Sequence, residues 1–161
     1  GFPHRGLRVA REIGTITYRS GPEWMERFGR KRAKEDVPRL DEDFQVENYL
    51  AYQGDKFCLQ YDPNSYLYIS KAMDLFDMVD GSSDGRAGSP PTLASIKAPT
   101  LIVGVKSDIL FPVWQQRELA DLLGETNPAV SYSEIDSPYG HDTFLIELDA
   151  IGAPIRSHLS R

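Results

Sequence analysis

A strand–helix–strand pattern in the last third of this sequence most limits the folds that the chain can adopt. The runs PTLIVGV (99–105) and VSYSEI (130–135) both read as strands. Between them, FPVWQQRELADLLG (111–124) has a proline near its start and a glycine after its end, as a helix does. This order predicts a βαβ unit with parallel strands, part of a doubly wound α/β sheet. Two strands are not stable as an independent sheet, so the unit is expected to be the last portion of a larger one.

The residues before this unit predict helices. Apolar side chains recur at mostly helical spacing from Gly6 to Ser20, with Gly6 as a possible cap. Asp62 and the proline after it are typical of a helix start. Further helices are expected over residues 22–29, 43–61, 62–78 and 142–159.

The composition changes at DGSSDGRAGSPP (80–91), which consists mostly of glycine, serine, proline and aspartate. Such a segment is typical of a flexible connection. We therefore expect a helical region over residues 1–80, a flexible connection over 81–92 and part of an α/β core over 93–161.

The charge balance argues against a surface that binds DNA or RNA. The chain has 18 basic and 24 acidic residues and a net charge of -6. Its dense basic run, Arg27 to Lys34, is followed at once by acidic residues, which favours a solvated mixed-charge loop. No apolar run approaches the roughly 20 residues that cross a bilayer. We therefore expect neither nucleic acid nor a membrane as a partner.

The single cysteine, Cys58, predicts neither an intrachain disulfide nor a metal site. It lies between apolar neighbours in DKFCLQY, where a buried, inert thiol is expected. The sequence starts without the apolar segment of a signal peptide. A reducing, cytoplasmic location is therefore expected, or an organelle if a targeting segment lies upstream.

Two side chains capable of acid–base chemistry follow the predicted strands. Asp108 lies just past the first strand and His141 lies in the loop after the second. Functional groups collect at this edge of α/β sheets, because the loops there face a shared crevice. In the α/β-hydrolase arrangement the acid and then the histidine follow the nucleophile in chain order, so Asp108 and His141 fit the last two members of a triad. A turn or N-cap role for Asp108 and an incidental loop position for His141 stay open at this point.

The sequence contains one literal G-x-S-x-G, at residues 81–85, with Ser83 at its centre. A nucleophile elbow needs a buried strand before it and a helix after it, because that strained turn exposes the hydroxyl. Ser83 instead follows a helix-like segment and precedes RAGSPP. A loop serine is therefore the favoured interpretation of Ser83.

Several segments closely resemble the C-terminal half of homoserine O-acetyltransferases. They are APTLIVGVKSDILFPVWQQRELADLL, YSEIDSPYGHDTFLIE, GLRVAREIGTITYRS, ERFGRK, FQVENYLAYQGDKF and DPNSYLYISKAMDLFD, which together cover nearly the whole chain. The same superfamily includes serine O-acyltransferases and a fungal deacetylcephalosporin acetyltransferase. The resemblance implies the C-terminal part of an α/β-hydrolase fold, with a helical lid followed by the last strand–helix units of the sheet.

The resemblance also implies roles for individual residues. It places Asp108 as the acid and His141 as the base of a Ser-Asp-His triad. Asp142 matches the position that holds the acceptor's amino group, Arg11 the arginine that pairs with its carboxylate, and Tyr18 a tyrosine lining the same site. Alternatively, Arg11 is a surface helix residue and Asp142 an N-cap.

The implied activity is ping-pong transfer of acetyl from acetyl-CoA to the hydroxyl of homoserine or serine. No permanently bound cofactor and no metal are expected. Family members carry the nucleophilic serine in an elbow upstream of the lid, so the expected partners are an N-terminal portion with that serine, an amino-acid acceptor and, in the complete enzyme, a second copy. The alternatives are a non-catalytic structural or interaction subunit and, among enzymes, a hydrolase or succinyl-specific relative.

Overall fold

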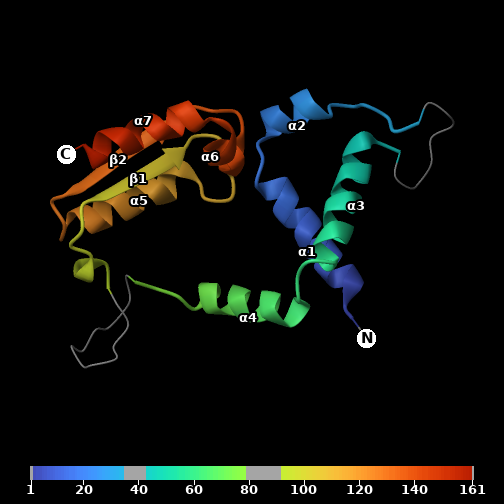
Figure 1. Ribbon diagram of the computed structural model, residues 1–161, viewed down its shortest axis with the longest axis horizontal. Helices are drawn as coiled ribbons and strands as arrows, with labels where there is room; N and C mark the ends of the chain where they lie inside the picture. The colour runs from blue at the N-terminus through green and yellow to red at the C-terminus, as the bar shows by residue number, and fades with distance from the viewer. Residues whose placement is uncertain (1, 35–42, 79–91, 161) are drawn as a thin grey trace.

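A computed structural model of the chain describes residues 2–34, 43–78 and 92–160. In the last of these ranges, β1 (Thr100–Val105) and β2 (Val130–Ile135) pair as parallel strands, in register from first residue to last. Helix α5 (Val113–Gly124) covers one face of this pair and α7 (Leu148–Leu159) covers the other (Figure 1). The predicted βαβ unit is confirmed.

A small apolar core holds α5 against the sheet. Ile102 of β1 packs with Ala120 and Leu123 of α5, and all three side chains are buried. The rim of this core includes residues of a short 3-10 helix, η1 (Leu93–Ser95). Burial of one large aliphatic side chain contributes about 1.5–3 kcal/mol, so even a small cluster fixes the position of the helix.

Buried Asn127 ties together the residues that precede the two strands. Its side chain is 2% exposed. Its Nδ2 donates to the carbonyl oxygen of Ala98 and its Oδ1 accepts the amide of Ala129, both at 2.9 Å. One side chain thereby sets the relative starting points of β1 and β2.

Residues 2–34 and 43–78 form helices, as predicted. They are α1 (His4–Thr17), α2 (Gly21–Arg27), α3 (Gln45–Cys58) and α4 (Pro63–Asp74). Helix α1 packs along α3 (Figure 1), and α4 begins close to the end of α3, where the ring of Tyr66 contacts that of Phe57. Asp62 caps α4 by accepting the amide of Ser65 at 2.7 Å, which confirms the predicted helix start.

Cys58 is buried, as predicted. It is the last residue of α3, its side chain is in contact with the start of α1, and its Sγ lies 3.5 Å from the carbonyl oxygen of His4. Burial, followed by the nearby charge of Asp55, raises the pKa of the Cys58 thiol. The thiol is therefore less ionised than a free cysteine, which suits an inert packing role.

The ends of α1 to α4 lie within about four residues of the predicted ones, and two features of the helices differ in kind from the prediction. Helix α1 starts at His4, so Gly6 lies inside it rather than capping it. The single helix expected over 142–159 is wrong: the 3-10 helix η2 (Gly140–Asp142), α6 (Thr143–Ile146) and α7 follow one another. The break is at Glu147, whose φ of -98° and ψ of 65° are not helical, and its Oε1 accepts the Ser137 hydroxyl at 3.3 Å. A contact with the preceding loop thus interrupts a sequence that contains no local helix breaker there.

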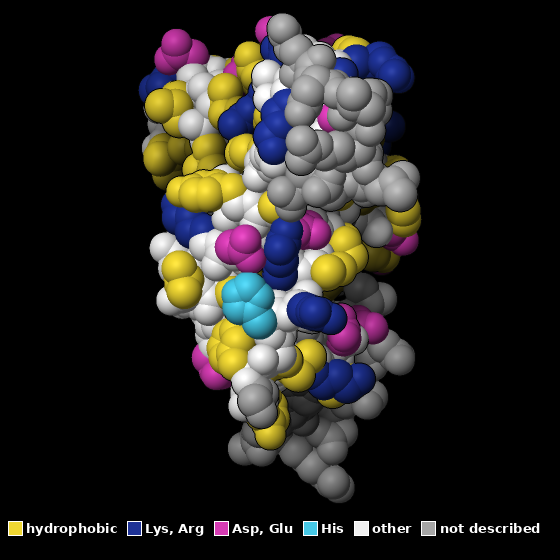
Figure 2. All heavy atoms as spheres, turned by 90° about the vertical axis from the view of Figure 1, so that its right-hand side faces the viewer, with side chains coloured by type: hydrophobic (Ala, Val, Ile, Leu, Met, Phe, Trp, Pro, Cys, Tyr) yellow, Lys and Arg dark blue, Asp and Glu magenta, His cyan; other side chains and the backbone are white. Residues whose placement is uncertain are grey.

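The basic run from Arg27 to Lys34 is only partly the solvated loop that was predicted. Arg27 ends α2 with its guanidinium 4.6 Å from the ring centre of Tyr49, and Arg32 binds both carboxylate oxygens of Asp43 at 3.1 and 2.8 Å. On the described part of the face in Figure 2, basic and acidic side chains are interspersed with apolar ones.

The turn between α1 and α2 docks onto the loop that follows β2. The amide of Asp142 donates to the carbonyl oxygen of Tyr18 at 3.1 Å, and the Ser20 hydroxyl donates to the carbonyl oxygen of Pro138. Gly140 has φ +61°, and a Cβ there would lie 2.9 Å from the backbone of Arg19 and Ser20. This turn-to-loop contact, here called the joint, requires glycine for both its conformation and its close approach.

Residues 79–91 lie outside the described part of the structure. The expected connection over 81–92, apart from position 92, and the G-x-S-x-G with Ser83 belong to this segment. Across the described ranges, none of the helices has the length and apolar character that crossing a bilayer demands.

Replacing Asn127 with alanine should lower the free energy of unfolding by about 2 kcal/mol, because the buried side chain makes two hydrogen bonds, to the carbonyl oxygen of Ala98 and the amide of Ala129, and both would be lost. Urea unfolding of the intact protein measures this. Asn48→Ala is the matched control, since Asn48 is exposed on α3, and should change stability by less than about 0.5 kcal/mol. Equal stabilities for the two variants would contradict the role of Asn127.

The variant Gly140→Ala should lower the free energy of unfolding by about 2 kcal/mol or more, because a left-handed backbone and a clash at the joint both oppose the methyl group. Thermal unfolding compares it with Gly124→Ala in α5, where a Cβ meets no atom within 4 Å. The control should be neutral or slightly stabilising. A neutral Gly140→Ala would show that the joint tolerates a side chain.

Candidate active site

Asp108 and His141, at the carboxyl ends of β1 and β2, form a hydrogen-bonded pair. The distance from His141 Nδ1 to Asp108 Oδ2 is 2.9 Å. The His141 side chain is 25% exposed and that of Asp108 is 9% exposed. The aspartate is thus nearly enclosed, whereas the imidazole reaches solvent. Parallel pairing of the strands brings these two side chains together, as expected for the edge at which both strands end.

The second carboxylate oxygen of Asp108 holds its own loop. Oδ1 accepts the amides of Leu110 and Phe111 at 2.8 and 2.9 Å. The turn role that the sequence left open for Asp108 is therefore present beside the contact with His141. Together these hydrogen bonds fix the direction in which Oδ2 points.

The ring of His141 lies among aromatic side chains. Its centre is 5.1 Å from that of Phe111, 5.7 Å from that of Phe144 and 5.9 Å from that of Tyr18. Among the described residues, no hydrogen bond to Nε2 is present. A carboxylate on Nδ1 favours the tautomer in which Nε2 has the free lone pair, so Nε2 can accept a proton from a hydroxyl group within hydrogen-bonding distance.

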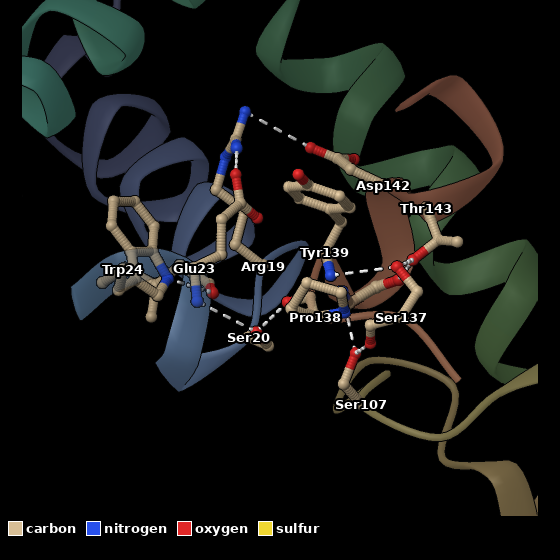
Figure 3. A network of polar contacts seen from close by, with 12 residues as sticks. Arg19, Ser20, Glu23, Trp24, Ser107, Ser137, Pro138, Tyr139, Asp142 and Thr143 are labelled. Carbon is tan, nitrogen blue, oxygen red and sulfur yellow. Dashed lines mark hydrogen bonds and ion pairs between the residues drawn. The ribbon is translucent and has the colours of Figure 1, made fainter. Parts of the chain in front are cut away.

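Small hydroxyl side chains hold the loop that carries His141 (Figure 3). Ser107 Oγ accepts the amide of Gly140 at 3.0 Å and donates to the carbonyl oxygen of Ser137 at 2.5 Å. Thr143, which is 0% exposed, donates to the carbonyl oxygen of Gly140 at 2.7 Å, with Ser137 Oγ 3.1 Å away. No sequence signal marked these residues as functional, because hydroxyl side chains in a loop resemble ordinary turn residues.

Arg11 and Tyr18 contact each other at the wall of a cavity of about 290 Å³. The guanidinium carbon of Arg11 lies 5.5 Å from the ring centre of Tyr18 and 5.2 Å from that of Phe57. Within the described ranges, no carboxylate forms an ion pair with Arg11. The remaining lining residues come from α1, from α4 and from the connection between α3 and α4: Ala10, Gly14, Tyr61, Tyr66, Ile69, Ser70 and Met73. The cavity therefore offers a cation in aromatic surroundings, which suits an anionic group.

Asp142 lies next to His141 and belongs to a charged network. Its Oδ2 is 3.5 Å from Arg19 Nη2, and Arg19 also binds the carboxylate of Glu23 (Figure 3). Asp142 precedes α6 but makes no side-chain capping hydrogen bond, so the structure does not support its N-cap alternative. Arg19 and Glu23 were not predicted, although Ser20 and Glu23 have the spacing of a helix-capping pair.

The candidate residues form one connected group. Arg11 contacts Tyr18, Tyr18 contacts His141, and His141 binds Asp108, while Asp142 is attached to Tyr18 through the backbone. No cluster of three or more metal-ligating side chains is found among the residues described. The group provides a proton acceptor bound to one carboxylate, with a cation and a second carboxylate nearby.

Sequence comparisons identify relatives with acyltransferase names. No family model matches the chain. A serine O-succinyltransferase of Emericella nidulans is 39% identical, and the match covers 98% of this chain and 42% of the relative. A homoserine O-acetyltransferase of Moorella thermoacetica is 44% identical, and the match covers 98% of this chain and 41% of the relative. An L-serine/homoserine O-acetyltransferase of Streptomyces lavendulae is 43% identical, and the match covers 98% of this chain and 43% of the relative. The chain thus spans about two fifths of the length of these relatives.

Solved structures give the same fold. The crystal structure of homoserine O-acetyltransferase from Bacillus anthracis matches with a TM-score of 0.79 at 22% identity, over all of this chain and 42% of that one. The esterase E22 matches with a TM-score of 0.75 at 21% identity, over 98% of this chain and 43% of the esterase chain. Both have the α/β-hydrolase fold, and the described residues form part of it. In sequence this chain belongs with a segment, about two fifths of the length, of the homoserine and serine O-acyltransferases, and its described residues fold as part of an α/β-hydrolase.

Proposed function

We propose that this chain forms the acid–base and acceptor-binding part of an O-acyltransferase that moves acetyl from acetyl-CoA to the hydroxyl of homoserine or serine. The observation that carries the proposal is the 2.9 Å contact of His141 with Asp108. The ring of His141 lies beside that of Tyr18, and Tyr18 and Arg11 line the same cavity. The names of the sequence relatives support the choice of acceptor.

In this proposal a serine from outside the 161 residues is the nucleophile. Its Oγ attacks the thioester carbonyl, while His141 Nε2 takes the hydroxyl proton and delivers it to the departing CoA sulfur. The acceptor hydroxyl then gives its proton to Nε2 and attacks the acyl-serine, and that proton returns to the serine oxygen. Asp108 keeps the imidazole in the required tautomer and stabilises its protonated form.

The proposed acceptor site follows from the charges around the histidine. A free amino acid has a carboxylate and an ammonium group, so it needs a fixed cation and a fixed anion. Arg11 is the cation, because the described residues give it no carboxylate partner, and Asp142 is the anion. Helices α1 to α4 are the lid over this site. An acetyl donor is proposed ahead of a succinyl donor, although the names of several relatives specify succinyl transfer.

In the complete polypeptide, meaning these residues together with the segment that supplies the serine, His141→Ala should lower acetyl transfer about a thousandfold or more. The reason is the loss of the proton acceptor in both half-reactions. Release of CoA from acetyl-CoA in the presence of homoserine measures it. His158→Ala in α7, where the imidazole lies 3.5 Å from Ser131 Oγ, is the control and should keep its activity. Full turnover by His141→Ala would contradict the assignment of His141 as the base, whereas no turnover by the unaltered protein would favour the non-catalytic subunit.

Arg11→Met should weaken acceptor binding about tenfold to a hundredfold, because a charge-assisted contact with the acceptor carboxylate would be lost. The readout is the KM for homoserine, compared with that for 3-aminopropanol, which has no carboxylate. The KM for 3-aminopropanol should not change. Arg5→Met, an exposed position on the same helix, is the control. Equal effects on both acceptors would show that Arg11 does not recognise the carboxylate.

A further inference from the structure

The Arg19 guanidinium lies between two carboxylates that come from distant parts of the chain. Its Nη1 binds Glu23 Oε1 in α2, and its Nη2 is 3.5 Å from Asp142 Oδ2 in η2 (Figure 3). The exposed fractions of the three side chains are 15% for Arg19, 8% for Glu23 and 19% for Asp142. Water screens these charges weakly, so the geometry of the trio affects which charged groups can bind nearby.

The backbone of Arg19 is fixed to the loop that carries His141. Residues on both sides of Arg19 bind this loop, Tyr18 through the Asp142 amide and Ser20 through the carbonyl oxygen of Pro138. Gly140 packs directly against the Arg19 backbone. The guanidinium is therefore held at a fixed position relative to the histidine, and it can position a side chain on the same loop.

Arg19 binds Glu23 more closely than Asp142, so the Asp142 carboxylate can also bind a second cation. Glu23 is buried, and its Oε2 has no hydrogen-bond partner among the described residues, so its charge depends on Arg19 for compensation. Asp142 interacts with Arg19 at a longer distance than a normal hydrogen bond. One positive and two negative charges leave the trio with one net negative charge, which favours an ammonium group.

We propose that Arg19 is a positioning residue that sets specificity for the amino group of the acceptor. Anchored by Glu23, it orients the Asp142 carboxylate beside His141 without neutralising it. This inference rests on the proposed function and deepens it. It adds Arg19, acting through Asp142, to the residues that decide how strongly the site prefers amino-acid acceptors to hydroxy acids without an amino group.

The test uses the complete polypeptide with the double substitution Arg19→Met and Glu23→Gln. This variant leaves no buried carboxylate unpaired and keeps the net charge of the trio at minus one, so only the orientation of Asp142 changes. The ratio of kcat/KM for L-homoserine to that for 4-hydroxybutyrate, which has no amino group, should fall about tenfold. The change should lie in the KM for homoserine. The acetylation burst with p-nitrophenyl acetate, which needs no acceptor, should be unchanged.

A second variant, Glu23→Gln alone, tests the charge rather than the orientation. With Glu23 neutral, Arg19 has Asp142 as its remaining carboxylate in the trio, so the net charge becomes zero and the KM for homoserine should rise. Arg8→Met with Glu12→Gln is the matched control, since this pair in α1 has the same spacing and a 2.8 Å ion pair. The control should keep both the ratio and the burst.

An unchanged acceptor ratio in the double variant, with the burst intact, would overturn the inference. The inference would also be overturned if kcat/KM fell equally for homoserine and for 4-hydroxybutyrate and the burst fell with them. That pattern indicates a merely structural role. If the unaltered protein acetylates with p-nitrophenyl acetate but transfers nothing to homoserine, the proposed function itself fails, and that result appears before any variant is made.

Discussion

The parallel pairing of β1 with β2 is the constraint on which the rest of the structure depends. Because the strands run the same way and are in register, the loops that follow them emerge at one edge of the sheet. Asp108 and His141 are 33 residues apart in sequence and meet there at 2.9 Å. The apolar contact of α5 with β1 and the two hydrogen bonds of Asn127 maintain this register from the opposite end of the strands.

The loop that carries His141 is held from two sides. On the core side, Ser107 and Thr143 bind the backbone of Gly140. On the helical side, the joint brings the turn after α1 against the same glycine. A histidine that must transfer protons in two directions needs a fixed position relative to both reaction partners. Anchoring the loop to the core and to the helices together supplies that position, and the joint also sets Tyr18 beside the imidazole.

Charges around the imidazole are divided unequally. Arg11 stacks on aromatic rings without a carboxylate partner in the described residues, whereas Arg19 contacts two carboxylates. One arginine is therefore available to an anion, and the other leaves a surplus of negative charge close to His141. In the proposed function this separation serves the two ends of a zwitterionic amino acid, and it depends on side chains from α1, α2 and η2 together.

The sequence by itself determined the βαβ unit, the burial of Cys58 and the position of Asp108 and His141 at strand ends. These features follow from local patterns and from the rule that parallel strands end at one edge. Only the tertiary structure decided the break at Glu147, the joint at Gly140 and the sharing of Arg19 between Glu23 and Asp142. The physical reason is sequence distance: Ser20 and Pro138 are 118 residues apart, and no periodicity or capping signal encodes a contact of that range.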